Sequence, residues 1–306
     1  MTATAQSSPD RRWIDTALAW YFVSVWGSGF LASKVALQYA PPFTMLTLRY
    51  LLGVACMLPV LLIARPAWPA SRREFAHVVV AGLLMHAVHL SGSHYSQYLG
   101  LSAGITALIM SLQTLATAVI AWQWMGERLT RMQWVGVVVG LAGVTLVVWH
   151  KIDVQELPLG SLVALGFGLT AITAGTLYQK TFCPTTDLKA GAFIQFAASS
   201  IALAPLAYFV EGARVDWTWQ LFASFAYLVI LASILATNAL NVLMRHGEAT
   251  RVTSLIYLTP ILAVALEYPM FGVVPSALSI AGIAVTCAGV AMVTWKSSRT
   301  PAVAAE

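Results

Sequence analysis

The chain has 306 residues, of which 59% are hydrophobic and only 9% are charged. Ordinary soluble domains have about 25% charged residues, so a soluble fold of this length could not cover its surface. The net charge of +5 does not indicate a nucleic-acid partner, because the basic residues stand in short clusters between apolar stretches and form no basic stripe. The lipid bilayer is therefore the expected solvent and partner of most of the chain.

The first dozen residues are polar, and Trp13 opens a long apolar stretch. No small-residue cleavage site follows a short hydrophobic region, so the stretch is interpreted as a retained first helix rather than a signal peptide. A bilayer core of about 30 Å needs roughly 20 helical residues. We predict an all-α membrane protein with ten transmembrane helices and no soluble domain. The expected spans are 14–34, 43–64, 76–98, 103–123, 132–149, 159–179, 190–210, 220–242, 250–270 and 274–295.

Basic residues predict the direction of these spans, because connections rich in lysine and arginine stay in the cytoplasm. Thirteen of the 17 basic residues lie in the two tails and in one alternating set of connections. The other set holds only Lys151 and Arg214, each beside acidic residues. Both termini are therefore expected to be cytoplasmic, in a multi-pass protein of the bacterial inner membrane.

The two halves of the sequence resemble each other at a fixed offset of 146 residues. The coinciding residues include Gly126 and Gly272, Pro59 and Pro205, Lys34 and Lys180, and Trp149 and Trp295. Each half holds five spans, an odd number, so the second copy should be inverted in the membrane. Inverted repeats favour alternating access to a site near the midplane. The expected organisation is a tail 1–12, a first repeat 13–150, an inverted second repeat 151–296 and a tail 297–306.

Three motifs carry a resemblance to a known family: the run Trp26–Phe30 with Lys34, the run Gly126–Thr130, and the run Tyr257–Pro260. Together they resemble the EamA-type family of the drug/metabolite transporter superfamily, over nearly the whole chain. The resemblance implies a ten-helix exporter of amino acids or other metabolites.

The chain departs from the family pattern at several positions. Thr114 stands where the family has a proline, and the second Gly-Glu pair is Gly272-Val273. The small multidrug exporters that resemble half of this protein carry a membrane glutamate eight residues before Lys34, where this chain has Trp26. The sequence thus gives no support to proton antiport by that route.

Polar side chains inside the spans are costly and usually face a cavity. In the third span His86, His89, Ser93 and Gln97 form one stripe at 100° per residue, with His94 and Tyr95 off it. The stripe fits either a wet central cavity or a set of hydrogen bonds between helices, and both interpretations stay open. His86 and His89 alone are too few ligands for a metal site, and no metal or other cofactor is expected.

Further candidates come from the other spans. The substrate-binding candidates are Trp26, His86, His89, Ser93, Gln113, Thr176, Asn238, Asn241 and Tyr257. Lys34 and Arg49, interpreted as lying at the outer ends of their spans, are candidates for attracting a substrate carboxylate or for reaching the interface. Glu267 is the one embedded carboxylate suited to proton coupling.

The most specific expectation is a transporter that exports amino acids, including neutral and aromatic ones, or related small metabolites by alternating access. The alternative is an exporter of lipophilic cations, other drugs or other metabolites. A channel remains open as a rival class, and so does an intramembrane enzyme with Ser28 as nucleophile, although no enzymatic activity is expected. The oligomeric state stays open, and a monomer is compatible with the sequence.

Overall fold

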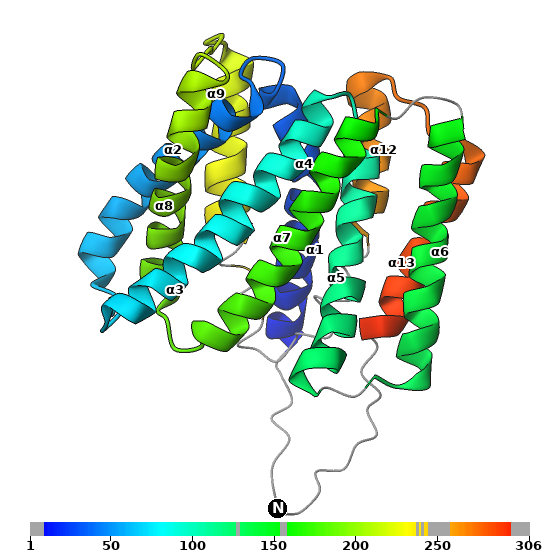
Figure 1. Ribbon diagram of the computed structural model, residues 1–306, viewed down its shortest axis with the longest axis horizontal. Coiled ribbons are helices and arrows are strands. Elements are labelled where there is room, and N and C mark those ends of the chain that lie inside the picture. The colour runs from blue at the N-terminus through cyan, green and yellow to red at the C-terminus, as the bar shows by residue number, and fades with distance from the viewer. Residues whose placement is uncertain are drawn as a thin grey trace, which may run out of the picture.

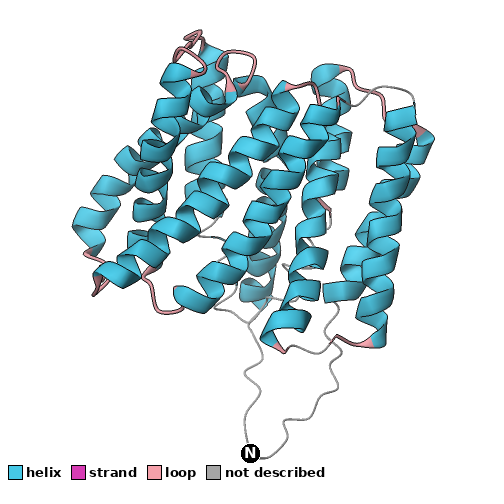
Figure 2. Cartoon of the chain, in the orientation of Figure 1, coloured by secondary structure: helices cyan, strands magenta, loops and turns pink. Residues whose placement is uncertain are grey.

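The computed structural model describes residues 9–126, 129–153, 158–236, 239, 242–243 and 258–294. Every secondary-structure element in these residues is helical, as Figure 2 shows. The helices are α1 (Pro9–Ala36), α2 (Pro42–Ala64), α3 (Arg72–Gly82), η1 (Leu83–Val88), α4 (His89–Tyr98), α5 (Ala103–Met125), α6 (Arg131–Asp153), α7 (Leu159–Phe182), α8 (Leu188–Phe209), α9 (Trp219–Ala226), η2 (Tyr227–Ala236), α12 (Thr259–Phe271) and α13 (Ala277–Thr294).

The helices agree with the expected membrane spans. Within the described ranges, eight continuous helical segments are long and apolar enough to cross a bilayer. The helix α1 covers the first expected span, and α12, with 13 described residues, covers part of the ninth. The prediction of an all-helical, multi-pass membrane protein is confirmed at this level.

Polar side chains at the connections define where several helices begin. The side chains of Ser71, Ser102 and Thr218 each accept a hydrogen bond from a backbone N–H in the first turn of the helix that follows. Asp187 accepts two such bonds from the first turn of α8. These caps satisfy N–H groups that a helix start leaves without an internal partner, a need that is acute beside lipid.

Helix boundaries recur at the offset of 146 residues seen in the sequence. The helices α1 and α7 end at Ala36 and Phe182, and α6 and α13 begin at Arg131 and Ala277. The helices α5 and α12 both stop at a glycine with a left-handed backbone, Gly126 (φ 71°) and Gly272 (φ 69°). A side chain is strained at such a backbone angle, which is why glycine ends both helices.

Both halves also contain a π-helical segment in the same place. In the third span η1 joins α3 to α4, and in the eighth span η2 follows α9. Shifted by 146 residues, η1 falls within η2. A π-helix has more residues per turn than an α-helix and rotates the side chains beyond it relative to those before it. The single stripe expected at 100° per residue therefore does not continue through residues 83–88.

Matching helices of the two halves pack against each other. As Figure 1 shows, α6 and α13 lie side by side at one edge of the molecule, and α2 and α8 lie together toward the other. Gly136 faces Gly289, while Gly143 faces Gly282 and Thr286, so α6 and α13 run antiparallel. Close approach through small residues is the usual means of helix packing in lipid, where burying apolar surface gives little driving force.

Candidate functional site

Polar side chains gather where the two halves of the chain meet. At this interface Ser28 contacts Tyr227 (2.5 Å between hydroxyl oxygens), and the Gln113 amide donates to the Thr176 hydroxyl (3.2 Å). His77 Nδ1 lies 2.7 Å from the hydroxyl of Tyr178. Each contact joins a helix of the first half to a helix of the second, so any movement between the halves must rearrange these hydrogen bonds.

Two further contacts are related by the 146-residue offset. Arg49 on α2 donates to the Ser233 hydroxyl on η2 across 3.4 Å. Gln195, the equivalent residue on α8, lies 3.2 Å from His86 on η1, with His86 Nε2–H donating to the amide oxygen. Each half thus sends one polar side chain from its second helix to the π-helical segment of the other half. Irregular helix at such a position is typical of functional sites in membrane bundles.

The side chain of Gln195 has its hydrogen-bonding groups more completely paired than the side chain of Arg49. The Gln195 amide nitrogen also donates to Gln179 on α7 across 3.0 Å, so both ends of this side chain have partners. Arg49 has five N–H donors, and Ser233 is its one hydrogen-bond partner within the described ranges. No carboxylate of those ranges lies within ion-pairing distance of Arg49.

Arg49 lies deeper than its sequence position suggested. The expectation placed it at the outer end of the second span, but α2 begins at Pro42 and Arg49 lies two turns inside that helix. It is half-buried, and the hydroxyl of the next residue, Tyr50, donates to the His86 carbonyl across 2.9 Å. Its interaction with Ser233 draws the side chain into the interface between the halves rather than out toward the membrane surface.

The histidines of the third span contact different neighbours. His86 meets α8 through Gln195, whereas His89 Nδ1 lies 3.2 Å from the Gly168 carbonyl on α7. These contacts correspond to the interpretation that polar groups of this span make hydrogen bonds between helices. Trp26 is 46% exposed and packs against Phe22, with 5.1 Å between ring centroids.

The last turns of α4 hold buried polar side chains that have no hydrogen-bond partner in the described part of the chain. Ser93, His94 and Gln97 are 1%, 3% and 5% exposed. The Ser93 hydroxyl, both His94 ring nitrogens and both Gln97 amide atoms make no hydrogen bond among the described residues. The Leu90 carbonyl lies near the His94 ring outside hydrogen-bonding geometry. Since buried polar groups are nearly always paired, this cluster is the most unusual feature of the bundle.

Lys34 and Glu267 form an ion pair at one end of the bundle. Lys34 Nζ lies 2.7 Å from Glu267 Oε1 and 4.7 Å from the centre of the Phe271 ring. Glu267 is only 2% exposed and also accepts the backbone N–H groups of Ala103 (2.8 Å) and Gly104 (2.9 Å). One carboxylate therefore joins α1, α12 and the N-terminus of α5, where the helix dipole favours a negative charge.

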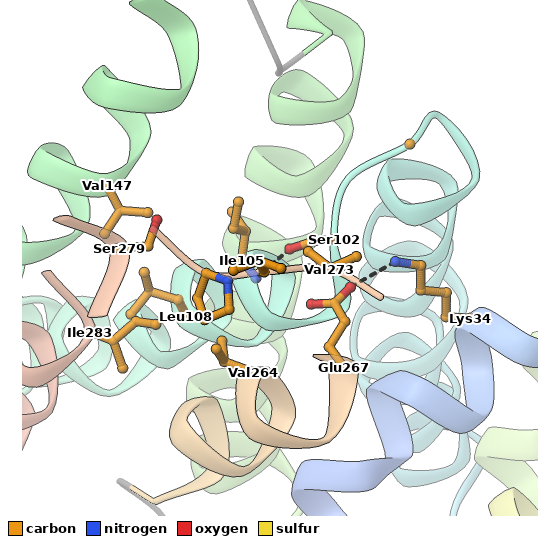
Figure 3. A pocket seen from close by; sticks show the side chains of 13 residues that line it. Lys34, Ser102, Ile105, Leu108, Val147, Val264, Glu267, Val273, Ser279 and Ile283 are labelled. Carbon is orange, nitrogen blue, oxygen red and sulfur yellow. Dashed lines mark hydrogen bonds and ion pairs between the residues drawn. The ribbon is translucent and has the colours of Figure 1, made fainter. Parts of the chain in front are cut away.

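The ion pair borders a pocket, drawn in Figure 3 with Lys34 and Glu267 facing each other on one side. The pocket has a volume of about 200 Å³, and Val264, Ile283 and Leu108 belong to its mainly apolar lining. It lies beside the start of α5 and the end of α12, and its lining includes neither Arg49 nor the histidines of the third span.

A second carboxylate acts in the same way on another helix. Glu211, just beyond α8, accepts the backbone N–H groups of Phe43 (3.0 Å) and Thr44 (2.7 Å) at the start of α2. The Thr44 hydroxyl donates to it as well, across 2.8 Å. Like Glu267, Glu211 belongs to the second half and caps a helix of the first half.

Asn238, Asn241 and Tyr257 lie outside the described residues. Sequence reasoning passed over Gln195, Tyr227 and Ser233 and placed His94 off the polar stripe. A signal for Gln195 was present, because the offset of 146 residues pairs it with Arg49 and both are polar residues in strongly apolar spans.

Replacing Gln195 with leucine should destabilise the protein. The change leaves His86 and Gln179 without this partner inside the bundle, and each unsatisfied buried group costs about 1–3 kcal/mol. We expect the midpoint of thermal unfolding in detergent to fall by several degrees. The matched control is Gln38→Leu at an exposed position, which should leave the midpoint within error. Equal midpoints for the two variants would contradict the role given to Gln195.

A helical membrane bundle of two matching halves, with polar side chains collected between them, has the architecture of a secondary transporter. Comparison with known proteins agrees. The EamA-like transporter family matches the chain twice, over residues 16–149 and again over residues 158–295. The chain therefore belongs to the EamA-like transporter family, a conclusion that indicates a transporter and not an enzyme.

Individual relatives are similar over most of their length. The uncharacterized transporter YvbV of Bacillus subtilis (strain 168) is 26% identical over 93% of this chain and 92% of its own. The uncharacterized inner membrane transporter YedA of Escherichia coli (strain K12) is 25% identical over 88% and 87%. A protein of Salmonella typhimurium named a probable amino-acid metabolite efflux pump is 25% identical over 90% and 93%. One crystal structure shares the fold, with a TM-score of 0.64 at 19% identity over 94% of this chain and 99% of that one.

Proposed function

We propose that the protein exports amino acids or related small metabolites across a bacterial inner membrane by alternating access. The observation that carries the proposal is the polar interface between the halves, where Arg49 and Gln195 reach across to equivalent π-helical segments. The names of the Salmonella relative and of YedA support the substrate class and the membrane. The proposed site comprises Arg49, His86, His89, Gln113 and Thr176, and Asn238, Asn241 and Tyr257 stay candidates from the sequence, outside the described residues.

The proposal includes an inverted arrangement of the halves, 13–150 and 151–296, with both termini in the cytoplasm. The antiparallel packing of α6 against α13 supports it. Contacts of α2 with α8 run the same way, because Thr47 lies near Ser200 while Gly53 lies near Phe196. Two copies related in this manner would exchange roles between inward-open and outward-open states.

Transport into proteoliposomes tests the substrate class. Purified protein should take up labelled neutral and aromatic amino acids with saturating kinetics, and unlabelled amino acid on the opposite side should accelerate the flux. A channel would give no such acceleration. Repeating the uptake with and without a pH gradient determines whether protons are coupled to transport. Movement of lipophilic cations without any amino acid in the panel would contradict the proposal.

Cysteine labelling tests the inverted arrangement. In a background free of Cys56, Cys183 and Cys287, cysteines at the exposed positions Ala70 and Arg214 should react with an impermeant maleimide from opposite sides of the membrane. Labelling of both from one side would contradict inversion. If Cys183 is retained, it should react slowly, because burial foremost and the nearby Glu74 charge raise the pKa of its thiol.

A further inference from the structure

Arg49 is a cation inside a membrane bundle and has no counter-ion among the residues that the structure describes. A charge in this environment is costly and normally pairs with a carboxylate or a hydrated group. In the described part of the chain Arg49 donates one long hydrogen bond, 3.4 Å to the neutral Ser233 hydroxyl. Lys34, by contrast, is fully engaged with Glu267 at 2.7 Å. The two basic residues of the first two spans therefore differ, and most N–H donors of Arg49 have no partner in the described ranges and could bind a ligand.

The guanidinium geometry indicates which ligand this is. Arginine presents a planar fork of N–H donors that matches a carboxylate in two parallel hydrogen bonds. A half-buried position within the bundle strengthens this interaction, because water screens it less than at the surface. A cationic substrate would be repelled by the same charge. The electrostatics of this position favour a ligand group that carries a negative charge.

The buried end of α4 packs against α2, the helix that carries Arg49, where Tyr95 stacks on Phe43 with 5.9 Å between ring centroids. Gln97, one turn beyond His94 along the helix, is 5% exposed, and neither of its amide atoms has a hydrogen-bond partner among the described residues. Its amide oxygen and an unprotonated nitrogen of His94 are acceptors suited to an ammonium group. Hydrogen-bond acceptors, and a guanidinium that has no counter-ion within the described ranges, are the two features that a zwitterion requires.

Building on the proposed export function, we propose that Arg49 binds the carboxylate of an α-amino acid while Gln97 and His94 accept its ammonium group. Recognition then rests on the charged head of the substrate, and the side chain of the amino acid contributes little to it. Broad selectivity among neutral amino acids follows, together with rejection of amines that lack a carboxylate.

Three probes that differ by one charged group test the assignment: phenylalanine, 3-phenylpropionate (no ammonium) and phenethylamine (no carboxylate). In the wild type, phenylalanine should bind best. The concentration of phenethylamine that halves the uptake of labelled phenylalanine should be at least about tenfold higher than that of unlabelled phenylalanine. Arg49→Gln should weaken the binding of phenylalanine and of 3-phenylpropionate by a similar factor and leave the binding of phenethylamine unchanged. Arg49→Lys keeps the charge without the fork and should retain the preference for carboxylates with a higher KM. Arg214→Gln, at an exposed position, is the matched control and should change nothing.

Gln97→Leu separates binding from folding. Because the Gln97 amide atoms have no partners in the part of the chain that the structure describes, an apolar side chain of similar size should raise the thermal unfolding midpoint of the protein without ligand by a few degrees. The same change should weaken the binding of phenylalanine several-fold and leave the binding of 3-phenylpropionate unaffected. A role limited to packing would lower the midpoint and change both ligands equally, and that result would overturn the assignment of Gln97.

The outcomes distinguish this site from the proposed function. Equal inhibition by phenylalanine and phenethylamine, unchanged by Arg49→Gln, would overturn the carboxylate site and leave amino-acid export intact. A different outcome is that no amino acid is transported, but 3-phenylpropionate still raises the unfolding midpoint in an Arg49-dependent manner. That result would support the carboxylate site and contradict the proposed export of amino acids. Thermal unfolding of each variant without ligand identifies a variant that fails to fold, and Arg49→Lys then decides the question.

Discussion

Lys34→Met is expected to lower the free energy of unfolding by about 3–5 kcal/mol, the usual cost of removing one partner from a buried ion pair. Glu267 is 2% exposed and would keep only the Ala103 and Gly104 N–H groups as partners. Its charge would then be uncompensated inside the bundle. Thermal unfolding and denaturation with SDS in mixed micelles both measure the loss.

The double variant Lys34→Met/Glu267→Gln should recover part of this loss. A neutral amide at position 267 can still accept a backbone hydrogen bond, and no isolated charge is left in the buried site. Lys189→Met is the matched control, since Lys189 is exposed in the first turn of α8, and it should have almost no effect. A double variant no more stable than Lys34→Met alone would show that the two charges are not coupled.

Gly289→Ala should separate α6 from α13. A methyl group at this position would overlap the backbone nitrogen of Gly140 and lie 2.5 Å from its Cα. These are backbone atoms that cannot turn aside, so the whole helix must move. We expect a loss of about 2 kcal/mol or more, toward the upper end of the usual cost of overpacking. The same denaturation experiment measures it.

Gly166→Ala is the control for this substitution. Gly166 also lies inside a helix, but no atom outside its own helix backbone and chain neighbours comes within 4 Å of the added methyl group. Alanine favours helix over glycine by about 0.5–1 kcal/mol, so this variant should be as stable as the wild type or slightly more stable. Similar losses for both variants would point to glycine flexibility rather than close packing as the property that α6 and α13 require.

The sequence predicted the helices well because lipid imposes a simple rule. A spanning segment must be long, apolar and helical, and these properties are visible in composition alone. The expected spans 43–64 and 103–123 differ from α2 and α5 by two residues or fewer at each end. The recurrence of boundaries also follows directly from glycines that end equivalent helices, at Gly126 and Gly272.

The interior of the bundle was harder to predict. An apolar segment has the same composition whether it forms an α-helix or a π-helix, so η1 could not be detected, and the face of each residue after it was uncertain. The depth of the Arg49 guanidinium in the membrane could not be predicted either, since an arginine seven residues into a span can extend to the surface or turn inward. The choice depends on a partner from the other half, and Ser233 is distant from Arg49 in sequence.

The two carboxylates that cap helices of the opposite half have a consequence for the energetics of transport. At the positions 146 residues earlier, the first half has Arg65 in place of Glu211 and Ala121 in place of Glu267. At one face of the molecule, two carboxylates therefore join the two halves, and the equivalent positions supply no carboxylate at the other face. In the proposed cycle the two access states would then be unequally populated at rest. The step that breaks the contacts of these two carboxylates would be the slower half of the cycle.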